Sequence, residues 1–298
     1  MPRWPSPVTR NAYPNHQPLT ANTYHGGHED CHGRRAAYPV FMRSLLLLAL
    51  ALTAVSAFAE DVPTKMTVRG KELYREDFAK PFAKYTGKPN GYASGFEGWL
   101  VHGTGPESRG GQWRLVDGRF HGSENPQVKH PATASYGIKF QNIILQCQVR
   151  LEDVELDKDP AHGRKFRYLQ LRATNEKSYL CSLSLNQGGF QINKDDNDRD
   201  GPDKMQVLVT HKKALAVGQW HTVLIEIMGD EYVATVDGHS VAAQHPAIAQ
   251  LKHSFMIVTG PEGSVRDLRL WEAKPNADWP MTRAVLAAEN NPVAPGKK

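Results

Sequence analysis

The sequence contains no apolar run long enough to cross a membrane and no basic stripe of the kind that binds nucleic acid. Its longest apolar stretch begins at Leu45 and covers about 15 residues, whereas a membrane-spanning helix needs about 20. Beyond residue 59, 31 lysines and arginines are interspersed with 29 aspartates and glutamates. A membrane-spanning anchor and a nucleic-acid partner are therefore both disfavoured.

The chain after residue 59 also lacks several catalytic motifs. It has no Gly-x-Ser-x-Gly elbow for a serine nucleophile and no His-Glu-x-x-His pair for zinc. It has no Glu-x-Asp-x-x-Glu run either, the pattern that supplies the two close carboxylates of a retaining glycosidase. Catalysis by a serine nucleophile, by zinc or by a retaining carboxylate pair is therefore disfavoured, and the sequence assigns no catalytic residue.

Residues 42–59 have the three parts of a cleavable secretion signal. Met42-Arg43-Ser44 is a short basic start, the apolar stretch follows, and Ala57-Phe58-Ala59 is a small-x-small cleavage site. Cleavage there predicts a secreted or periplasmic protein that keeps no membrane span after processing.

The 41 residues before this signal are rich in proline and histidine, and their apolar residues show no helical or strand period. We expect either a disordered leader at 1–41 or a true translation start at Met42. A metal-binding leader is the alternative, because three histidines surround Cys31 within residues 25–32.

Two cysteines, Cys147 and Cys181, lie beyond the signal. Each falls at an apolar position of a strand-like run. Export permits a disulfide bridge between neighbouring strands, whereas two buried free thiols would behave as small hydrophobic side chains. The sequence leaves both alternatives open.

From Gln112 onward, short apolar runs alternate with turn signals about 8–12 residues apart, and no helical run separates them. Asp117-Gly118 and Asp237-Gly238 are hairpin dipeptides that supply positive backbone φ angles. The pattern predicts an all-β domain over 76–273, built as an antiparallel two-sheet β-sandwich of the jelly-roll type.

The flanking segments differ from this pattern. Residues 60–75 are expected to form an extended lead-in segment, and 87–111 are rich in glycine and predict loops. At the other end, residues 274–298 predict a short helix, centred on 281–289, and a disordered tail.

Aromatic residues stand where loops lead into strands. Trp113 and Trp220 occupy such positions, where an indole can cover the open end of a sandwich core. We expect both to be structural core aromatics. His221 follows in a nearly apolar run and is expected to be a packed histidine rather than an acid–base group.

Several stretches together resemble a known family. They are 111–118, 218–227, 236–238 and 266–271. The chain over roughly residues 73–273 is similar to the concanavalin A-like sandwich of secreted bacterial 3-keto-disaccharide hydrolases. The resemblance implies a two-sheet sandwich that acts on or binds glycans.

One part of that family's pattern is missing here. The family carries an Asn-Ser-Gly-aliphatic run that leads into a strand ending in arginine. The corresponding place in this chain, 162–172, keeps the arginine as Arg172 and lacks the Asn-Ser-Gly. The resemblance therefore supports a glycan partner and leaves catalysis open.

Alternation along two predicted strands turns polar side chains away from the core. Leu169 and Leu171 share one side of their strand, so their neighbours point outward. Five side chains have this outward orientation: Gln146, Gln148, Tyr168, Gln170 and Arg172. If both strands belong to one sheet, these residues form a polar face suited to sugar hydroxyls. The alternative is an ordinary solvated sheet surface.

An acidic loop offers a second candidate site. Asp196, Asp198, Asp200 and Gly201 match the first half of a calcium-binding loop, in which oxygen ligands recur at every second position. The twelfth position is Val207, where such loops have a bidentate glutamate. We expect no cofactor, with a calcium ion at this loop as the alternative to a solvated hairpin.

The sequence thus predicts a secreted, glycan-directed β-sandwich protein with a carbohydrate partner. It would be a hydrolase of (3-keto-)glycosides or a degenerate relative of one. A noncatalytic carbohydrate-binding or cell-surface interaction module is the alternative, and a purely structural envelope protein would need no site at all.

Overall fold

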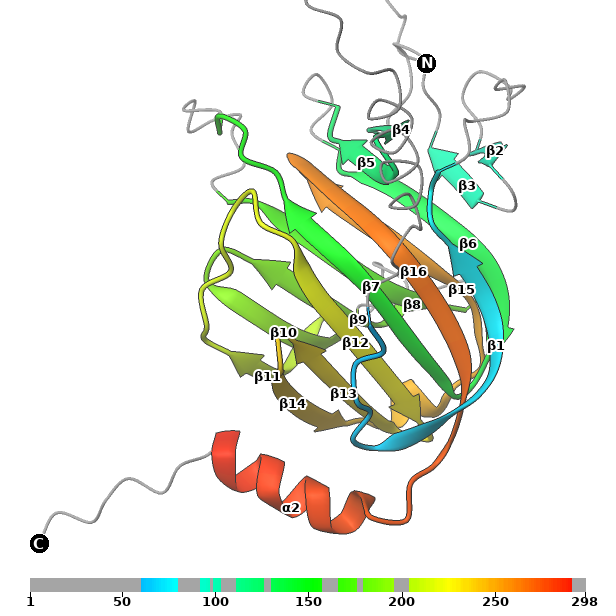
Figure 1. The fold of residues 1–298 in the computed structure, drawn as a ribbon, viewed down its shortest axis with the longest axis vertical. Helices are drawn as coiled ribbons and strands as arrows, with labels where there is room; N and C mark the ends of the chain where they lie inside the picture. The colour runs from blue at the N-terminus through cyan, green and yellow to red at the C-terminus, as the bar shows by residue number, and fades with distance from the viewer. Residues whose placement is uncertain are drawn as a thin grey trace, which may run out of the picture. The chain divides into compact units, whose positions relative to one another are not determined.

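Two antiparallel sheets pack face to face in the computed structural model of the chain (Figure 1). The structure describes residues 60–79, 92–96, 99–102, 111–125, 130–156, 166–175, 179–195 and 204–290, all within the unit Ala57–Lys298. The leader, the signal, the acidic loop with Asp196, Asp198 and Asp200, and the tail at 291–298 lie outside the described residues. The expectations for those segments stay predictions.

We name the first sheet A. Its strands are β1 (Thr67–Glu76), β4 (Gln112–Val116), β5 (Arg119–Ser123), β7 (Ile143–Leu151), β12 (His221–Met228), β13 (Glu231–Val236), β14 (His239–Gln244) and β16 (Glu262–Pro275). Their order is β14-β13-β12-β7-β16-β5-β4. The first part of the long strand β16 pairs with β5, and its second part pairs with β1.

The second sheet is sheet B. Its strands are β2 (Tyr92–Phe96), β3 (Trp99–His102), β6 (Ala132–Phe140), β8 (Tyr168–Thr174), β9 (Tyr179–Asn186), β10 (Gly189–Lys194), β11 (Gln206–His211) and β15 (Lys252–Gly260). Their order is β11-β10-β9-β8-β15-β6-β3-β2. The predicted all-β, two-sheet sandwich is confirmed.

The core lies between the inner faces of the two sheets, where apolar residues recur at every second position. On β8, Leu169 and Leu171 are 0% and 2% exposed, whereas their neighbours Tyr168, Gln170 and Arg172 are half-buried. The hairpins are also as predicted. Asp117 and Gly118 have φ angles of 49° and 67°, and Asp237 and Gly238 have 47° and 81°, which matches the two-residue turn that twisted strands favour.

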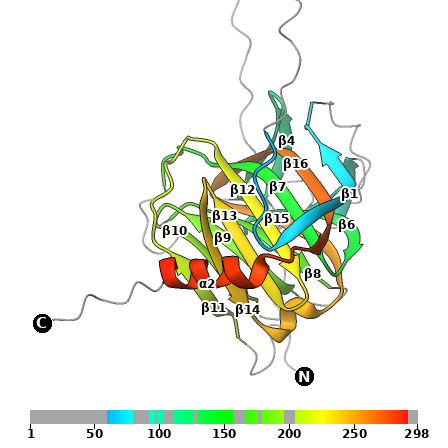
Figure 2. The same cartoon turned by 60° about the horizontal axis from the view of Figure 1, so that its bottom comes forward.

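Two short helices complete the described chain. The 3-10 helix η1 (Pro246–Ala249) joins β14 to β15, and α2 (Trp279–Asn290) follows β16. The position of α2 confirms the predicted C-terminal helix. It lies across the outer face of sheet A (Figure 2), where Trp279 and Leu286 pack against Met66 and Val233. Among the described residues, no helix combines the length and apolar character needed to cross a membrane.

The lead-in segment is part of the sandwich rather than a separate extension. Residues 60–75 are extended, as expected, but β1 pairs along β16 and so belongs to sheet A. The boundary expected at residue 76 therefore divides a strand. The buried carboxylate of Glu226 fixes this segment by accepting hydrogen bonds from the backbone N–H groups of Lys65, Met66 and Thr67, and from the Thr67 hydroxyl.

The two cysteines are free and buried. Cys147 lies on β7 of sheet A, whereas Cys181 lies on β9 of sheet B, so they are not on neighbouring strands. Burial raises the pKa of both thiols, that of Cys181 to about 12. Of the two alternatives left open by the sequence, the structure has the buried free thiols.

One of the two tryptophan predictions is wrong. Trp113 is a core residue, stacked on Phe120 with ring centroids 4.3 Å apart. Trp220 is only half-buried, and the guanidinium carbons of Arg150 and Arg266 lie 4.8 and 4.2 Å from its ring centroid. Arginines stack on aromatic faces, so this indole covers the outer side of sheet A rather than the end of the core.

Candidate functional site

The polar residues predicted to form one face lie on two different sheets. Tyr168, Gln170 and Arg172 are on β8 of sheet B, and Gln146 and Gln148 are on β7 of sheet A. Both groups turn away from the core, as alternation predicted. Because the strands belong to opposite sheets, the two groups face opposite sides of the sandwich and the expected combined face does not form.

Gln146 is occupied by the chain itself. It is 1% exposed. Its carbonyl oxygen accepts hydrogen bonds from Val62 N and Arg69 Nη2, at 3.0 and 2.9 Å, and its amide donates to the Glu60 carbonyl oxygen at 2.9 Å. These bonds attach the lead-in segment to sheet A, so Gln146 has a structural role rather than a sugar-binding one.

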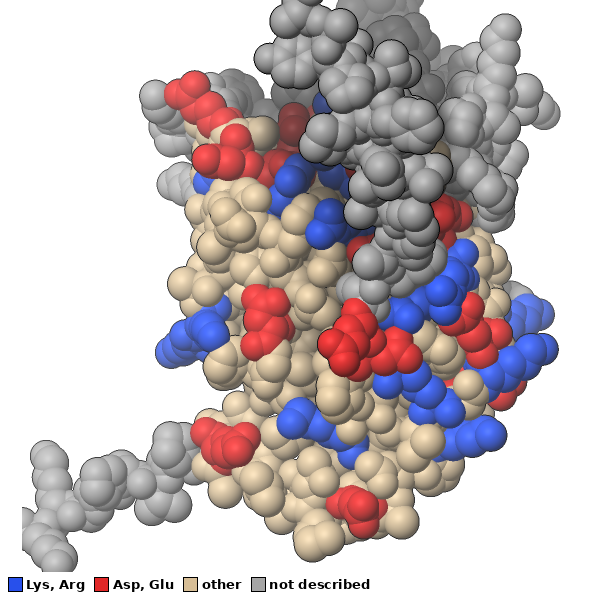
Figure 3. All heavy atoms as spheres, viewed as in Figure 1, with Lys and Arg blue, Asp and Glu red and all other residues tan. Residues whose placement is uncertain are grey.

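Gln148 is half-buried on the same side of sheet A. Its side-chain oxygen accepts a hydrogen bond of 2.6 Å from Arg266 Nε. The same arginine lies over Trp220. On this side of the molecule, acidic and basic side chains lie next to one another (Figure 3).

A connected polar network covers the outer face of sheet B over β8, β9 and β10. Gln170 Nε2 donates to Ser184 Oγ at 2.9 Å, and Arg172 Nη2 donates to Gln170 Oε1 at 2.9 Å. The network follows from register, because Gln170 is paired with Ser184 and Arg172 with Ser182. Two predicted residues are therefore joined to a neighbouring strand that the sequence did not connect to them.

The network continues onto β10 through amides and hydroxyls. Asn193 Nδ2 donates to Ser184 Oγ at 2.8 Å and to Ser182 Oγ at 3.3 Å. Gln191 Nε2 in turn donates to Asn193 Oδ1 at 2.8 Å. Asn193 and Ser182 are fully buried, whereas Gln191 and Gln170 are half-buried at the surface of the network. Each side chain is held by the next, which fixes the direction of its remaining donors and acceptors.

Arg172 connects this network to a buried carboxylate. Its Nε lies 3.1 Å from Asp195 Oδ2, with side-chain exposures of 16% and 3%. Ser182 Oγ donates to Asp195 Oδ1 at 2.9 Å, and the guanidinium lies over the Tyr179 ring. Burial raises the pKa of the Asp195 carboxyl above its ordinary value, although Arg172 and Ser182 counteract part of that rise.

An aromatic group lies beside the network. Phe166 is exposed, and its ring centroid is 5.9 Å from that of Tyr168. A Cβ on Gly260 would lie 2.7 Å from Glu124 Oε2 and 3.1 Å from the Tyr168 ring. The lack of a side chain at Gly260 therefore lets Glu124 and Tyr168 approach each other at this end of the face.

A different charged cluster lies at the end of β7 on sheet A. Arg150 Nη2 donates to Glu152 Oε1 at 2.9 Å, Ser264 Oγ also donates to that oxygen, and His121 Nδ1 is 3.1 Å from Ser264 Oγ. Burial alone would raise the pKa of Glu152, but its contacts with His121, Ser264 and Arg150 outweigh that effect and hold the pKa at about 2. Because Ser264 is fully buried, this cluster is no nucleophilic site.

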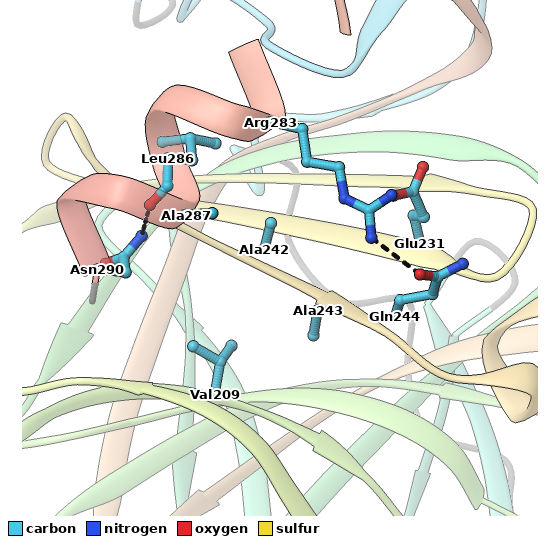
Figure 4. Close-up of a pocket in the computed structure, with 9 residues that line it drawn as sticks. All are labelled: Val209, Glu231, Ala242, Ala243, Gln244, Arg283, Leu286, Ala287 and Asn290. Carbon is cyan, nitrogen blue, oxygen red and sulfur yellow. Dashed lines mark hydrogen bonds and ion pairs between the residues drawn. The ribbon is translucent and has the colours of Figure 1, made fainter. Parts of the chain in front are cut away.

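A cleft of about 200 Å³ separates α2 from the edge strands β11 and β14 (Figure 4). Arg283 crosses the rim of this cleft. Its Nη1 lies 2.9 Å from Glu231 Oε1, and its Nη2 donates a hydrogen bond of 2.8 Å to Gln244 Oε1. The apolar lining of the cleft consists of Val209, Leu286 and three alanines, Ala242, Ala243 and Ala287. Ligand sites are usually larger, at about 300–1,000 Å³, so this cleft is a weak candidate for a small-molecule site.

The remaining predicted residues contribute no described site. Among the described residues, no group of three or more His, Cys, Asp or Glu side chains could hold a metal ion. His221 is a packed histidine, as expected, with Nδ1 2.6 Å from Asp237 Oδ2 and Nε2 2.9 Å from the Ala216 carbonyl oxygen.

Five members of the network were not predicted from the sequence: Ser182, Ser184, Gln191, Asn193 and Asp195. Alternation within β9 turns Ser182 and Ser184 to the same side as Gln170, which was a usable signal. Their pairing with β8 was also accessible, because the two strands are consecutive and separated by only four residues in the sequence, which favours an antiparallel hairpin. The burial of Asp195, which follows β10, had no signal in the sequence.

Comparison with known proteins supports the fold. A model of the laminin G domain matches residues 169–272, which agrees with the predicted concanavalin A-like sandwich. None of the curated proteins is similar enough in sequence to match this chain.

Solved structures with a related arrangement include two from Bacillus subtilis. A carbohydrate-binding module is 11% identical over 59% of this chain and 96% of that chain, with a TM-score of 0.45. A protein of unknown function with a galectin-like fold is 12% identical over 71% and 100%, with a TM-score of 0.47. A Bacillus licheniformis β-glucanase is 12% identical over 68% and 98%, with a TM-score of 0.44.

Proposed function

We propose that the protein binds a glycan on the outer face of sheet B, at the network centred on Gln170 and Arg172. We also propose that it does so outside the cytoplasm, after removal of the signal at 42–59. The observation that carries the proposal is the continuous chain of amides and hydroxyls, from Gln191 to Arg172, on three adjacent strands.

The chemistry of this network suits sugar hydroxyls. An amide side chain has both donors and acceptors, and a guanidinium has five donors in a fixed fork. Gln170 uses one amide proton on Ser184 and accepts one bond from Arg172, so it retains a further donor and a lone pair. Because these side chains are already held in place, binding would cost little side-chain entropy.

The aromatic residues beside the network also favour a glycan ligand. Sugar rings have apolar C–H faces that pack on aromatic rings, and Phe166 is exposed beside Tyr168. The charge balance favours a neutral glycan, since Arg172 is paired with Asp195. An acidic sugar would have to compete with Asp195 for the guanidinium.

Hydrolysis of a 3-keto-glycoside is the second candidate function, and Asp195 is the observation that favours it. Asp195 is the carboxyl joined to the network through Arg172 and Ser182, and a carboxyl whose pKa is raised by burial can act as a general acid. Because its side chain is 3% exposed, this role requires that substrate binding open the ion pair with Arg172. The variant Asp195→Asn distinguishes the two candidate functions. If the protein is a hydrolase, this variant abolishes turnover and keeps saturable binding.

The test of the proposal is calorimetric titration of the purified protein with neutral disaccharides and 3-keto-glycosides, while chromatography monitors product formation. We expect saturable binding that Gln170→Ala weakens about tenfold, the effect of one lost hydrogen bond. The matched control is Gln148→Ala, a half-buried glutamine on the opposite sheet, which leaves affinity unchanged. Absence of binding, or equal losses in both variants, would refute the proposal.

A further inference from the structure

The outer face of sheet B changes its chemistry between β8 and β15. Strand register places Val258 directly beside Gln170, and Met256 directly beside Arg172. The second row continues from Met256 to Ser135 on β6 and then to Leu100 on β3. Along these two rows, the polar side chains on β8, β9 and β10 are thus followed on β15 and β3 by three apolar side chains that we name the apolar half: Met256, Val258 and Leu100. The β6 positions of the two rows are Thr133 and Ser135.

Part of the apolar half is open to solvent. Leu100 is 42% exposed, Met256 is half-buried, and Val258 is nearly covered at 4%. Solvent-facing positions of a sheet are normally polar. Apolar residues that follow a fixed polar network on one face therefore indicate a surface adapted to a ligand with both kinds of chemistry.

One buried polar atom beside the apolar half also points to a ligand. Thr133, paired with Val258, is 7% exposed, and its Oγ1 has no hydrogen-bond partner among the described residues. Buried hydroxyls are nearly always hydrogen-bonded in folded proteins. Thr133 lies in the first row, next to Val258, so a ligand that extends from Gln170 across β15 would reach this hydroxyl.

We infer that the ligand is a glycan joined to an apolar group, such as an alkyl or aryl glycoside. This inference rests on the proposed function and names the class of glycan: the sugar lies on the network around Gln170, and the aglycone lies along the row from Met256 to Leu100. Strands β15 and β3 are two strand spacings apart, about 10 Å, a distance that an octyl chain covers.

The test compares matched glycosides by calorimetry on the full protein. Methyl and octyl β-D-glucopyranoside, and the corresponding galactopyranosides, are titrated below the concentration at which the octyl compounds form micelles. We expect an octyl glycoside to bind at least about tenfold more tightly than its methyl counterpart, the gain from burying roughly two methylene groups. Met256→Gln and Leu100→Gln each reduce this gain and leave methyl glycoside binding unchanged.

The control variant is Met281→Gln, which alters an exposed methionine on α2 and should keep the full octyl gain. Thermal unfolding of each variant verifies that it is folded. Equal affinity for methyl and octyl glycosides, or an octyl gain that survives Met256→Gln, overturns the inference and leaves the proposed function standing. If none of these glycosides binds although a disaccharide does, the inference alone is overturned. If neither these glycosides nor the disaccharides and 3-keto-glycosides bind, the proposed function is refuted, and the inference with it.

Discussion

The outer faces of the two sheets use the same kinds of side chain for different purposes. On sheet A, Gln146 and Glu226 bond to the backbone of residues 60–67, and α2 covers β13 and β14. On sheet B, Gln170, Arg172 and their neighbours bond to one another. Outward polar residues on a sheet are therefore not evidence of a ligand site until it is known what they contact.

This difference leads to opposite expectations for the two faces. Changes to sheet A should lower stability and spare glycan binding, because its polar groups hold the chain's own segments. Changes at the exposed side of the sheet B network should lower binding with a smaller effect on stability. The predictions that follow test this contrast.

The largest expected effect is at Glu226. Glu226→Ala removes the acceptor of three backbone N–H groups and one hydroxyl, which leaves buried donors unpaired. We expect the free energy of unfolding to fall by about 4 kcal/mol, measured by urea denaturation. Glu289→Gln, at an exposed position of α2, should change it by less than about 0.5 kcal/mol. A similar small change at Glu226 would show that the lead-in segment is held by other contacts.

A smaller loss is expected at the buried ion pair of sheet B. Arg172→Ala leaves Asp195 buried without its cation, at a cost of about 3 kcal/mol. The double variant Arg172→Ala/Asp195→Ala should recover part of that loss, because no unpaired charge remains. Denaturation of the two single variants and the double variant gives the coupling energy. Strictly additive losses would mean that the two side chains do not interact.

Acid stability should depend on Glu152 of the sheet A cluster. Its pKa is lowered from 4.5 to about 2 in the folded chain, so its ionised form stabilises the fold above pH 4.5, and this contribution is lost as the pH falls toward 2. We expect a loss of about 1–2 kcal/mol over that range, allowing for partial solvent screening. Denaturation curves at several pH values should show a smaller acid dependence for Glu152→Gln. If the free energy of unfolding of Glu152→Gln depends on pH as steeply as that of the unaltered protein, Glu152 does not have this role.

The smallest effect is expected at Phe166. Phe166→Ser removes an exposed ring beside Tyr168 and should weaken glycan affinity about three- to tenfold, corresponding to roughly 1 kcal/mol of stacking. Its melting temperature should match that of the unaltered protein. A stability loss without a change in affinity would make this ring part of the fold rather than of the binding face.

Local patterns predicted the fold well. The period of two at Leu169 and Leu171 identified the inward side of β8, and each Asp-Gly dipeptide identified a turn, because both signals depend only on adjacent residues. The expectation of loops over 87–111 was wrong at β2 and β3, which pair with each other at the edge of sheet B. Strand β6 was missed because Ala132 and Ala134 fill its buried positions and give little apolar signal. Strand β1 was missed because charged residues such as Lys71 and Arg75 dominate it, although it pairs with β16.

The candidate site was predicted only in part, because a site on a sheet depends on which strands are neighbours. Alternation oriented Gln170 and Arg172 correctly. It could not determine that β7 and β8, although consecutive among the described strands, belong to different sheets, and so it wrongly joined Gln148 to Gln170. The pairing of β8 with β15, which places Met256 beside Arg172, joins segments far apart in the chain.

The most direct test of the account is to locate a bound glycan by the methionine methyl signals in an NMR titration. Met256 lies on the outer face of sheet B, whereas Met228 and Met281 lie on β12 and α2 at the sheet A side. With a disaccharide that binds in calorimetry, the Met256 signal should shift saturably while those of Met228 and Met281 stay in place. Shifts at Met228 or Met281 with an unchanged Met256 would place the ligand on the other side of the sandwich and contradict the account.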